Sequence, residues 1–438
     1  MAGHTSEKKT GTLVVALLFF GILTCYILQM SPAPILLDLG EHFGVLDNNS
    51  LLNLPVNIMY PFIIFGCLFG PTLDTKIGTR NLFVLTMGFV IVGTLLNFVA
   101  SGSYAVLLIG RSLFGIGFGF GIPFIGSAIM QWFKPRGREK MNTLNGFFPF
   151  IGTLICFSAV APLAATFGWE FSLGVWGIVG LVILIAWLLL VKARSLPNYA
   201  EEAESVANEG ASEPEKRLFR DLLGRPAIRL LVITFSLDFL NYSFVATILP
   251  MFIAESGNFS NELAGLASSV AFPGIGLVGC LVGGVVMSKL GKRKPQFLIG
   301  SAIEFVGLMT ATLGANTSVA FVLVGISLYA FGNGFWLPSL YCVPMELKGM
   351  TASKAGASFA LISAVGFAFG FLSPIVGGVM TDGLMQMSGF AASAAQHVFG
   401  LRWTLFVFGL MYIINFICFL KIQETGPGKH VPEQTQEA

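Results

Sequence analysis

The chain has 438 residues, of which 55% are hydrophobic and only 11% are charged. A soluble globular protein carries about 25% charged residues, so this chain lacks the charge that a water-exposed surface needs. The composition therefore excludes an ordinary soluble fold and predicts an integral membrane protein in contact with a lipid bilayer. The net charge of +2 does not indicate a nucleic-acid partner.

The six cysteines all lie within apolar segments, and none has the spacing of a metal site. We interpret them as small core residues and expect no disulfide, metal or cofactor. The N-terminal segment runs into a long apolar stretch without a small-residue cleavage site. We therefore expect a first membrane span there, and not a removed signal peptide.

Twelve apolar runs are long enough for membrane helices, which need about 20 residues to cross the bilayer core. The fold class predicted from them is an all-α membrane protein with twelve transmembrane helices. The predicted spans are 12–37, 50–73, 81–101, 104–133, 141–166, 171–192, 228–253, 262–288, 295–315, 318–345, 355–381 and 401–421.

The basic residues predict the orientation, because cytoplasmic loops of membrane proteins hold an excess of Lys and Arg. With the N-terminus inside, the inner segments hold every Lys and Arg except Arg111 and Arg402. Both termini are thus expected in the cytoplasm.

A polar segment divides the spans into two groups of six. Residues 193–227 are rich in Glu, Ala, Ser and Lys, which predicts a cytoplasmic linker. The expected domains are a six-helix bundle over 1–192, this linker, a second bundle over 228–421 and a cytoplasmic tail over 422–438. We expect the tail to be disordered.

The two halves also repeat in sequence. The run Arg111 to Pro123, RSLFGIGFGFGIP, returns as Ile326 to Pro338, ISLYAFGNGFWLP. Two parallel repeats of six spans are an arrangement of secondary transporters, which hold substrate near the midplane between the halves. The other matched pairs are Gly66/Gly279, Cys67/Cys280, Leu68/Leu281, Gly70/Gly283, Lys76/Lys289, Gly78/Gly291, Arg80/Arg293, Tyr26/Tyr242 and Pro34/Pro250.

One charge interrupts the repeat, because Arg111 stands opposite Ile326. Arg111 lies roughly 11 Å into the fourth helix, at 1.5 Å per residue. A buried arginine costs about 2.5–3.5 kcal/mol, so it needs a cavity or a partner. It either binds an anionic substrate group or a proton-carrying carboxylate, or makes a structural tie to backbone carbonyls. The glycines that follow it resemble a nucleotide loop only superficially, and helix packing explains them.

Two acids lie within predicted spans. Asp238 is close to the midplane of the seventh helix, where its first-half counterpart is Ile22. A buried carboxylate of this kind could take up a proton during transport, and substrate that breaks a pair with Arg111 would couple proton and solute. Glu304 lies in the middle of the ninth helix, where it serves proton coupling or a structural hydrogen bond.

The motifs resemble those of the major facilitator superfamily over nearly the whole chain. The stretch Gly70 to Arg80 is similar to the family's motif between helices two and three, although Thr75 stands where the family has its acid and Asp74 precedes it. Arg111 with its spaced glycines is similar to the fourth-helix motif. The stretch Val343 to Gly356 resembles the inner loop of the oxalate/formate and cyanate branches. The second and eighth helices lack the arginines of nitrate carriers.

The resemblance implies which residues face substrate and which move. Helices one, four, seven and ten line the cavity in this family. The substrate-binding candidates on them are Tyr26, Gln29, Arg111, Asn241, Tyr242, Asn333, Trp336 and Tyr341. The candidates for proton coupling are Asp238, Arg111 and Glu304. The candidates for conformational gating are Asp74, Lys76, Arg80, Lys289 and Arg293.

These features predict a secondary active transporter that moves a small, carboxylate-like organic anion by alternating access. We expect coupling to protons or another ion, by symport or antiport, in a monomer in the bacterial inner membrane. The alternatives are proton-driven efflux of an amphipathic drug or metabolite, and a facilitated carrier of a neutral solute. A receptor or assembly protein on the same scaffold is a further class; a large soluble sensor domain would favour it, and we expect none from this sequence. No enzyme is expected, because the four histidines lie in tails and outer segments.

Overall fold

The computed structural model describes residues 2–45, 51, 54–132, 135–191, 215–257, 259, 261–387 and 394–427. Within these ranges every regular element is a helix, and twelve helical segments are long and apolar enough to cross a membrane. A helix bonds all of its backbone groups internally, as a chain surrounded by lipid must. The prediction of an all-α protein with twelve membrane helices is therefore confirmed, while the cytoplasmic placement of both termini stays a prediction.

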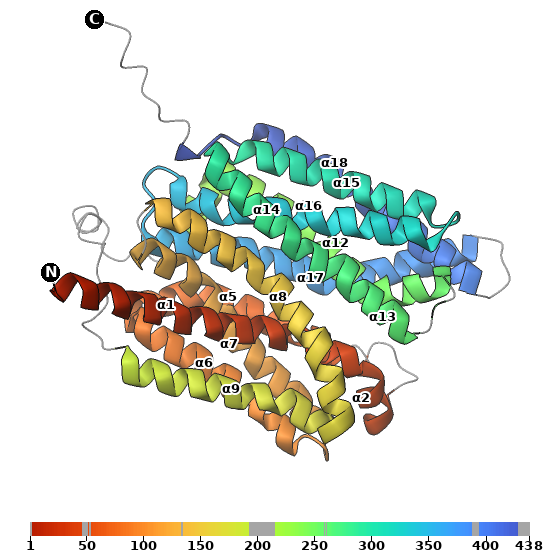
Figure 1. Ribbon diagram of the computed structural model, residues 1–438, viewed down its shortest axis with the longest axis horizontal. Coiled ribbons are helices and arrows are strands. Elements are labelled where there is room, and N and C mark those ends of the chain that lie inside the picture. Colours follow the sequence, from red (N-terminus) through yellow and green to blue (C-terminus); the bar gives the residue numbers. More distant parts are fainter. Residues whose placement is uncertain are drawn as a thin grey trace, which may run out of the picture. The chain divides into compact units, whose positions relative to one another are not determined.

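Figure 1 shows the helices in chain order, coloured from red at the N-terminus to blue at the C-terminus. Those of the first half are α1 Ala2–Gln29, α2 Leu36–Phe43, α4 Leu54–Asn57, α5 Met59–Ile77, α6 Thr79–Leu95, α7 Tyr104–Trp132, α8 Pro135–Phe167 and α9 Trp169–Leu190. Those of the second half are α11 Glu215–Gly224, α12 Pro226–Gly257, α13 Asn261–Ser269, α14 Ile275–Leu290, α15 Lys294–Gly314, α16 Val319–Glu346, α17 Ala352–Met387 and α18 Ala394–Lys421.

Two of the departures of the observed helices from the predicted spans occur at prolines. The first span breaks after Gln29 into a turn and a 3-10 helix at Ala33–Ile35, before α2 begins. The eighth span is divided into α13 and α14 by a π-helical turn at Val270–Gly274, which contains Pro273. Proline has no N–H to donate, so both departures occur where the normal helical hydrogen bonds are interrupted.

The chain forms two compact units. The first consists of Met1–Lys134, Phe148–Leu222 and Thr351–Leu372, and the second of Pro135–Phe147, Leu223–Met350 and Ser373–Ala438. Most of the expected linker, residues 192–214, lies outside the described residues, and its last part forms α11. The domain boundaries given above stay a prediction.

In the first unit, the repeated glycines let α7 approach α5 and α6. A Cβ on Gly119 would meet the Ile63 carbonyl and come within 2.8 Å of Gly66 Cα on α5. A Cβ on Gly117 would come within 2.7 Å of the Thr86 carbonyl on α6. Small residues at such crossings allow membrane helices to pack backbone to backbone.

The second unit uses the matching glycines in the same way. A Cβ on Gly334 would meet the Gly276 carbonyl on α14, and one on Gly332 would come within 2.7 Å of the Gly300 carbonyl on α15. Helix α16 thus packs between α14 and α15 as α7 packs between α5 and α6. The sequence repeat is a repeat of helix packing.

Candidate functional site

Polar side chains gather between four helices of the second unit, and Asp238 of α12 is one of the two carboxyl groups that they contact. Asn333 Nδ2 of α16 donates to both carboxylate oxygens of Asp238, at 3.0 Å and 2.9 Å. The hydroxyl of Tyr412, on α18, donates to Oδ1 at 2.7 Å. All three side chains are buried. The predicted coupling residue Asp238 and the predicted substrate residue Asn333 are therefore brought into direct contact.

Glu304 of α15 completes this cluster from the other side of Asn333. Its Oε1 accepts from Asn333 Nδ2 at 3.2 Å and from Trp336 Nε1 at 2.9 Å. One amide nitrogen thus lies between two carboxyl groups, and both of those groups are buried. We call Asp238, Glu304, Asn333, Trp336 and Tyr412 the carboxyl cluster.

Helix packing explains how these groups meet. Gly332 of α16 packs against Glu304, whose Cγ and N would both lie 2.9 Å from a Cβ at that position. Gly300 of α15 leaves the space that Trp336 occupies. Helices α15 and α18 lie side by side in the second unit (Figure 1). Helix α18 also packs against α12, and this second contact brings Tyr412 toward Asp238. Gly332 and Gly300 therefore position the cluster.

Arg111 lies in the first unit and is held by backbone groups. Its Nε donates to the Pro55 carbonyl at 2.7 Å, and its terminal nitrogens donate to the Leu28 and Gln29 carbonyls at 2.7 Å and 2.8 Å. The guanidinium also lies 5.0 Å from the ring centroid of Phe114.

Two of the carbonyls that Arg111 binds, those of Leu28 and Gln29, lie at the end of α1, and the third, that of Pro55, lies in α4. The last carbonyls of a helix have no partner within it, and a cation stabilises that end of the helix dipole. In the second half α12 continues without a break through Pro250, the counterpart of Pro34, and Ile326 replaces the arginine. These contacts fit the structural alternative for Arg111. Anion binding by Arg111, and a pair between Arg111 and Asp238 of the other unit, stay predictions.

The other predicted lining residues are divided between the units. In the first unit, Tyr26 lies 5.1 Å from the Phe118 ring, centroid to centroid, and Gln29 is buried. In the second unit, Asn241 Nδ2 donates to the Leu237 carbonyl of its own helix at 3.0 Å, and the Tyr242 ring lies 5.0 Å from that of Phe272. Tyr341 is half-buried on α16. Their substrate contacts stay predictions.

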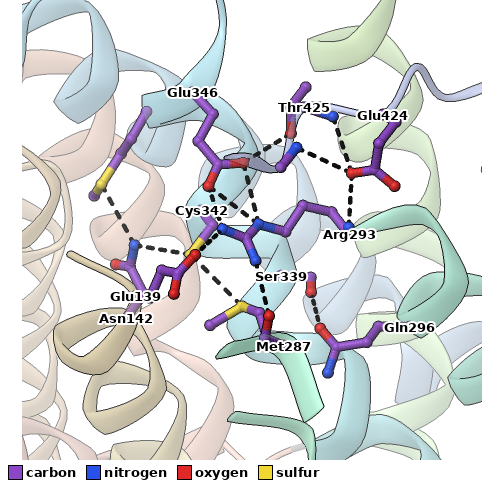
Figure 2. A network of polar contacts seen from close by, with 12 residues as sticks. Glu139, Asn142, Met287, Arg293, Gln296, Ser339, Cys342, Glu346, Glu424 and Thr425 are labelled. Atoms are coloured by element: carbon purple, nitrogen blue, oxygen red, sulfur yellow. Dashed lines mark hydrogen bonds and ion pairs between the residues drawn. The ribbon is translucent and has the colours of Figure 1, made fainter. Parts of the chain in front are cut away.

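A second network surrounds Arg293, just before α15 (Figure 2). Its guanidinium contacts the carboxylates of Glu346, at the end of α16, and Glu139, near the start of α8, each at 2.5 Å. Arg293 is 1% exposed. Burial opposes its charged form, but the hydrogen bonds and charge of Glu346, together with Glu139, raise the pKa of Arg293 above its ordinary value. This predicted gating residue is therefore a permanent cation that joins three helices.

The residues after α18 are part of this network. Glu424 accepts from the backbone N–H groups of Arg293 at 2.7 Å and Lys294 at 3.1 Å, where α15 begins. The Thr425 hydroxyl donates to Glu346 at 2.8 Å. Burial works against the Glu424 carboxylate, but backbone hydrogen bonds lower its pKa below the ordinary value. The expected disorder of the tail is wrong for residues 422–427, because a carboxylate at a helix N-terminus satisfies otherwise unpaired donors.

The remaining gating candidates make simpler contacts. Arg80 Nε donates to the Val191 carbonyl at the end of α9, at 2.7 Å. Lys76 and Lys289 are exposed, and Asp74 is half-buried near the end of α5. Gating by these residues stays a prediction. Among the described residues there is no group of three or more His, Cys, Asp or Glu side chains that could hold a metal ion.

Several contact residues did not emerge from the sequence. Tyr412 is a single tyrosine in the apolar helix α18, the twelfth membrane span. Glu139 and Glu424 lie in polar segments without a motif. Glu346 lies inside the stretch Val343 to Gly356 that resembles an anion-porter loop. For these contact residues, that resemblance is the one sequence feature that could have indicated a role. Helix periodicity identifies faces but does not tell which helices are neighbours, so these partners could not be assigned.

Comparison with known proteins identifies the family. The model of the Major Facilitator Superfamily matches residues 18–374. The chain belongs to the major facilitator superfamily. Its structure is similar to that of the proton:xylose symporter XylE, with a TM-score of 0.72, 16% identity, and 96% of this chain and 97% of that chain covered. The superfamily consists of transporters, so this chain is a transporter and not an enzyme.

Curated relatives are similar at low identity. A probable sulfoacetate transporter of Cupriavidus necator is 27% identical over 353 residues, which cover 74% of this chain and 76% of the relative. A probable galactarate/D-glucarate transporter of Bacillus subtilis is 23% identical over 401 residues, covering 84% and 85%. Sugar transport protein 8 of Arabidopsis thaliana is 24% identical over 367 residues, covering 74% and 70%.

Proposed function

We propose that this chain is a proton-coupled secondary active transporter of a small organic anion, working by alternating access. The carboxyl cluster of the second unit is the observation that carries the coupling. Two carboxyl groups bonded to one amide nitrogen, in a buried place, repel each other strongly when both are charged. The state with one proton on the pair is therefore less costly than the state with two negative charges. Loss or gain of that proton changes the net charge of the site.

The relatives support an organic anion as the solute. Two of them are named for the transport of sulfoacetate and of galactarate/D-glucarate, both of which carry negative charge. Arg111 supports the same class, because its hydrogen-bond partners are neutral. Neutral carbonyls hold the guanidinium in place without cancelling its charge, so the first unit keeps a buried positive charge that attracts an anion.

A neutral sugar is the second candidate. Sugar transport protein 8 is about as similar to this chain as the anion transporters are, and the xylose symporter has the same fold. Three amide and three phenol side chains among the predicted cavity residues are available to a sugar, so the preference for an anion rests on Arg111 and on the two anion transporters. The proposal has three further parts. We infer that the chain is similar to the oxalate/formate and cyanate branches, that it lies in a bacterial inner membrane and that it is a monomer.

Counterflow into proteoliposomes tests the solute class. Proteoliposomes that contain the purified protein are loaded with unlabelled sulfoacetate, galactarate, glucuronate, xylose, glucose or a lipophilic cation. Uptake of the same compound, labelled and added outside, is then followed. We expect exchange of one or more of the anions and none of the sugars or the cation. Exchange of sugars alone would replace the anion by a neutral solute, and exchange of the lipophilic cation alone would support drug efflux.

A further inference from the structure

The two carboxyl groups of the cluster differ in the number of donors that reach them. Asp238 receives hydrogen bonds on both oxygens, from Asn333 and Tyr412. Glu304 receives donors only on Oε1, from Asn333 and Trp336. Its Oε2 is buried and has no hydrogen-bond donor among the described residues. Glu304 is 0% exposed, so bulk water does not supply one.

This difference decides which group is charged. An ionised carboxylate accepts hydrogen bonds on both oxygens and donates none. A charged oxygen buried without a donor is more costly than a neutral one. The donor arrangement thus suits an ionised Asp238 and a protonated Glu304.

The closeness of the two groups supports the same assignment. Asn333 Nδ2 lies 2.9 Å from Asp238 Oδ2 and 3.2 Å from Glu304 Oε1, so the two carboxyls are near neighbours. Because two ionised carboxylates at this separation repel each other, the pair favours a single charge and one proton. The other titratable groups close to this pair are the phenols of Tyr329 and Tyr412. The Tyr412 hydroxyl donates to the Tyr329 hydroxyl oxygen at 3.4 Å.

We propose that Glu304 holds the transported proton and that Asp238 is the fixed anion beside it. Tyr412 is a positioning residue: with Asn333 it keeps the charge on Asp238, so that the proton stays on Glu304. The inference rests on the proposed proton coupling and makes it more specific. The proton is carried by Glu304 of α15, and the negative charge stays on Asp238, where Tyr412 of α18 stabilises it. When the proton leaves Glu304, two adjacent charges replace one, and their repulsion drives the cluster apart.

Infrared spectroscopy of the purified, reconstituted protein at neutral pH tests the assignment without a substrate. A protonated carboxyl has a C=O stretching band that a carboxylate lacks. In wild-type protein we expect this band to shift when glutamate carboxyls are labelled with ¹³C and to stay in place when aspartate carboxyls are labelled. The comparison needs no substitution and therefore cannot fail through misfolding.

Variants then locate the band. Glu304→Gln should remove it, and Asp382→Asn, at an exposed carboxyl of α17, should leave it unchanged. Tyr412→Phe should shift its frequency, because Asp238 loses a donor and draws the Glu304 proton more strongly. A band that responds to aspartate labelling, persists in Glu304→Gln or is absent from wild-type protein would overturn the assignment. Failure of wild-type protein to accumulate solute under a pH gradient would overturn the proposed function alone, since the band is measured without transport.

Discussion

Arg111 illustrates how one charge in a membrane helix can serve the backbone. Its nitrogens satisfy carbonyls where α1 ends and in α4, and so join three helices of the first unit. The interruption of the repeat at Arg111 and Ile326 matches a difference in structure, because the first span breaks and the seventh does not. Asp238 interrupts the repeat as well, but its partners are the side chains of Asn333 and Tyr412 and not backbone carbonyls.

Replacing Arg111 should therefore affect stability first. We expect Arg111→Ala to lower the free energy of unfolding by about 1–3 kcal/mol for each buried carbonyl left without a donor. Arg111→Lys should lie between this variant and wild type, because one ammonium cannot reach all three carbonyls. Thermal unfolding in detergent measures the effect, with Arg402→Lys as a control at a partly exposed arginine. An Arg111→Ala protein as stable as wild type, but unable to bind an anion, would give Arg111 a purely substrate-binding role.

At the scale of helices, the repeat is a pattern of close crossings. The pairs Gly117/Gly332 and Gly119/Gly334 occupy matching crossings in the two units. Only glycine fits there, because the added Cβ would meet backbone atoms, which cannot rotate away. Gly332 also brings α15 and α16 close enough for the carboxyl cluster to form.

The crossings predict which glycines can be replaced. Gly119→Ala and Gly334→Ala should each destabilise the protein by about 1–3 kcal/mol, the usual cost of overpacking a core. Gly88→Ala is the matched control, because a Cβ at Gly88 of α6 meets no atom within 4 Å. Thermal unfolding of the three variants provides the comparison. Equal loss of stability in all of them would mean that the close crossings are not what limits these positions.

The segment after α18 predicts a dependence on pH. Glu424 has a lowered pKa in the folded protein, so its contribution is complete above its ordinary pKa of 4.5 and is lost as the pH falls through the folded value. Amide hydrogen exchange at Arg293, Lys294 and Gly426, corrected for the intrinsic rate at each pH, should show protection that disappears in acid.

In Glu424→Gln the same protection should already be weak at neutral pH and should change little on acidification. Asp382→Asn should behave as wild type. Protection of these amides that does not depend on pH in wild-type protein would contradict a role for the Glu424 carboxylate.

At the scale of the whole molecule, hydropathy and charge were sufficient for the helix number, because lipid leaves a spanning chain few alternatives to a helix. The sequence also named Asp238, Glu304, Asn333 and Trp336, since polar groups in apolar helices are rare. It did not predict that they meet, or that Tyr412 joins them, because contacts between helices depend on packing across distant segments. The break after Gln29 was also missed, because prolines in a membrane helix are compatible with an unbroken helix.

The central claim is that the carboxyl cluster couples proton movement to solute. The most direct test is accumulation of whichever anion exchanges in counterflow, driven by a pH gradient across proteoliposomes containing wild-type, Glu304→Gln, Asp238→Asn or Asp382→Asn protein. We predict accumulation by wild type and Asp382→Asn, and exchange without accumulation by the two cluster variants. Accumulation by Glu304→Gln and Asp238→Asn at the wild-type level would contradict the claim.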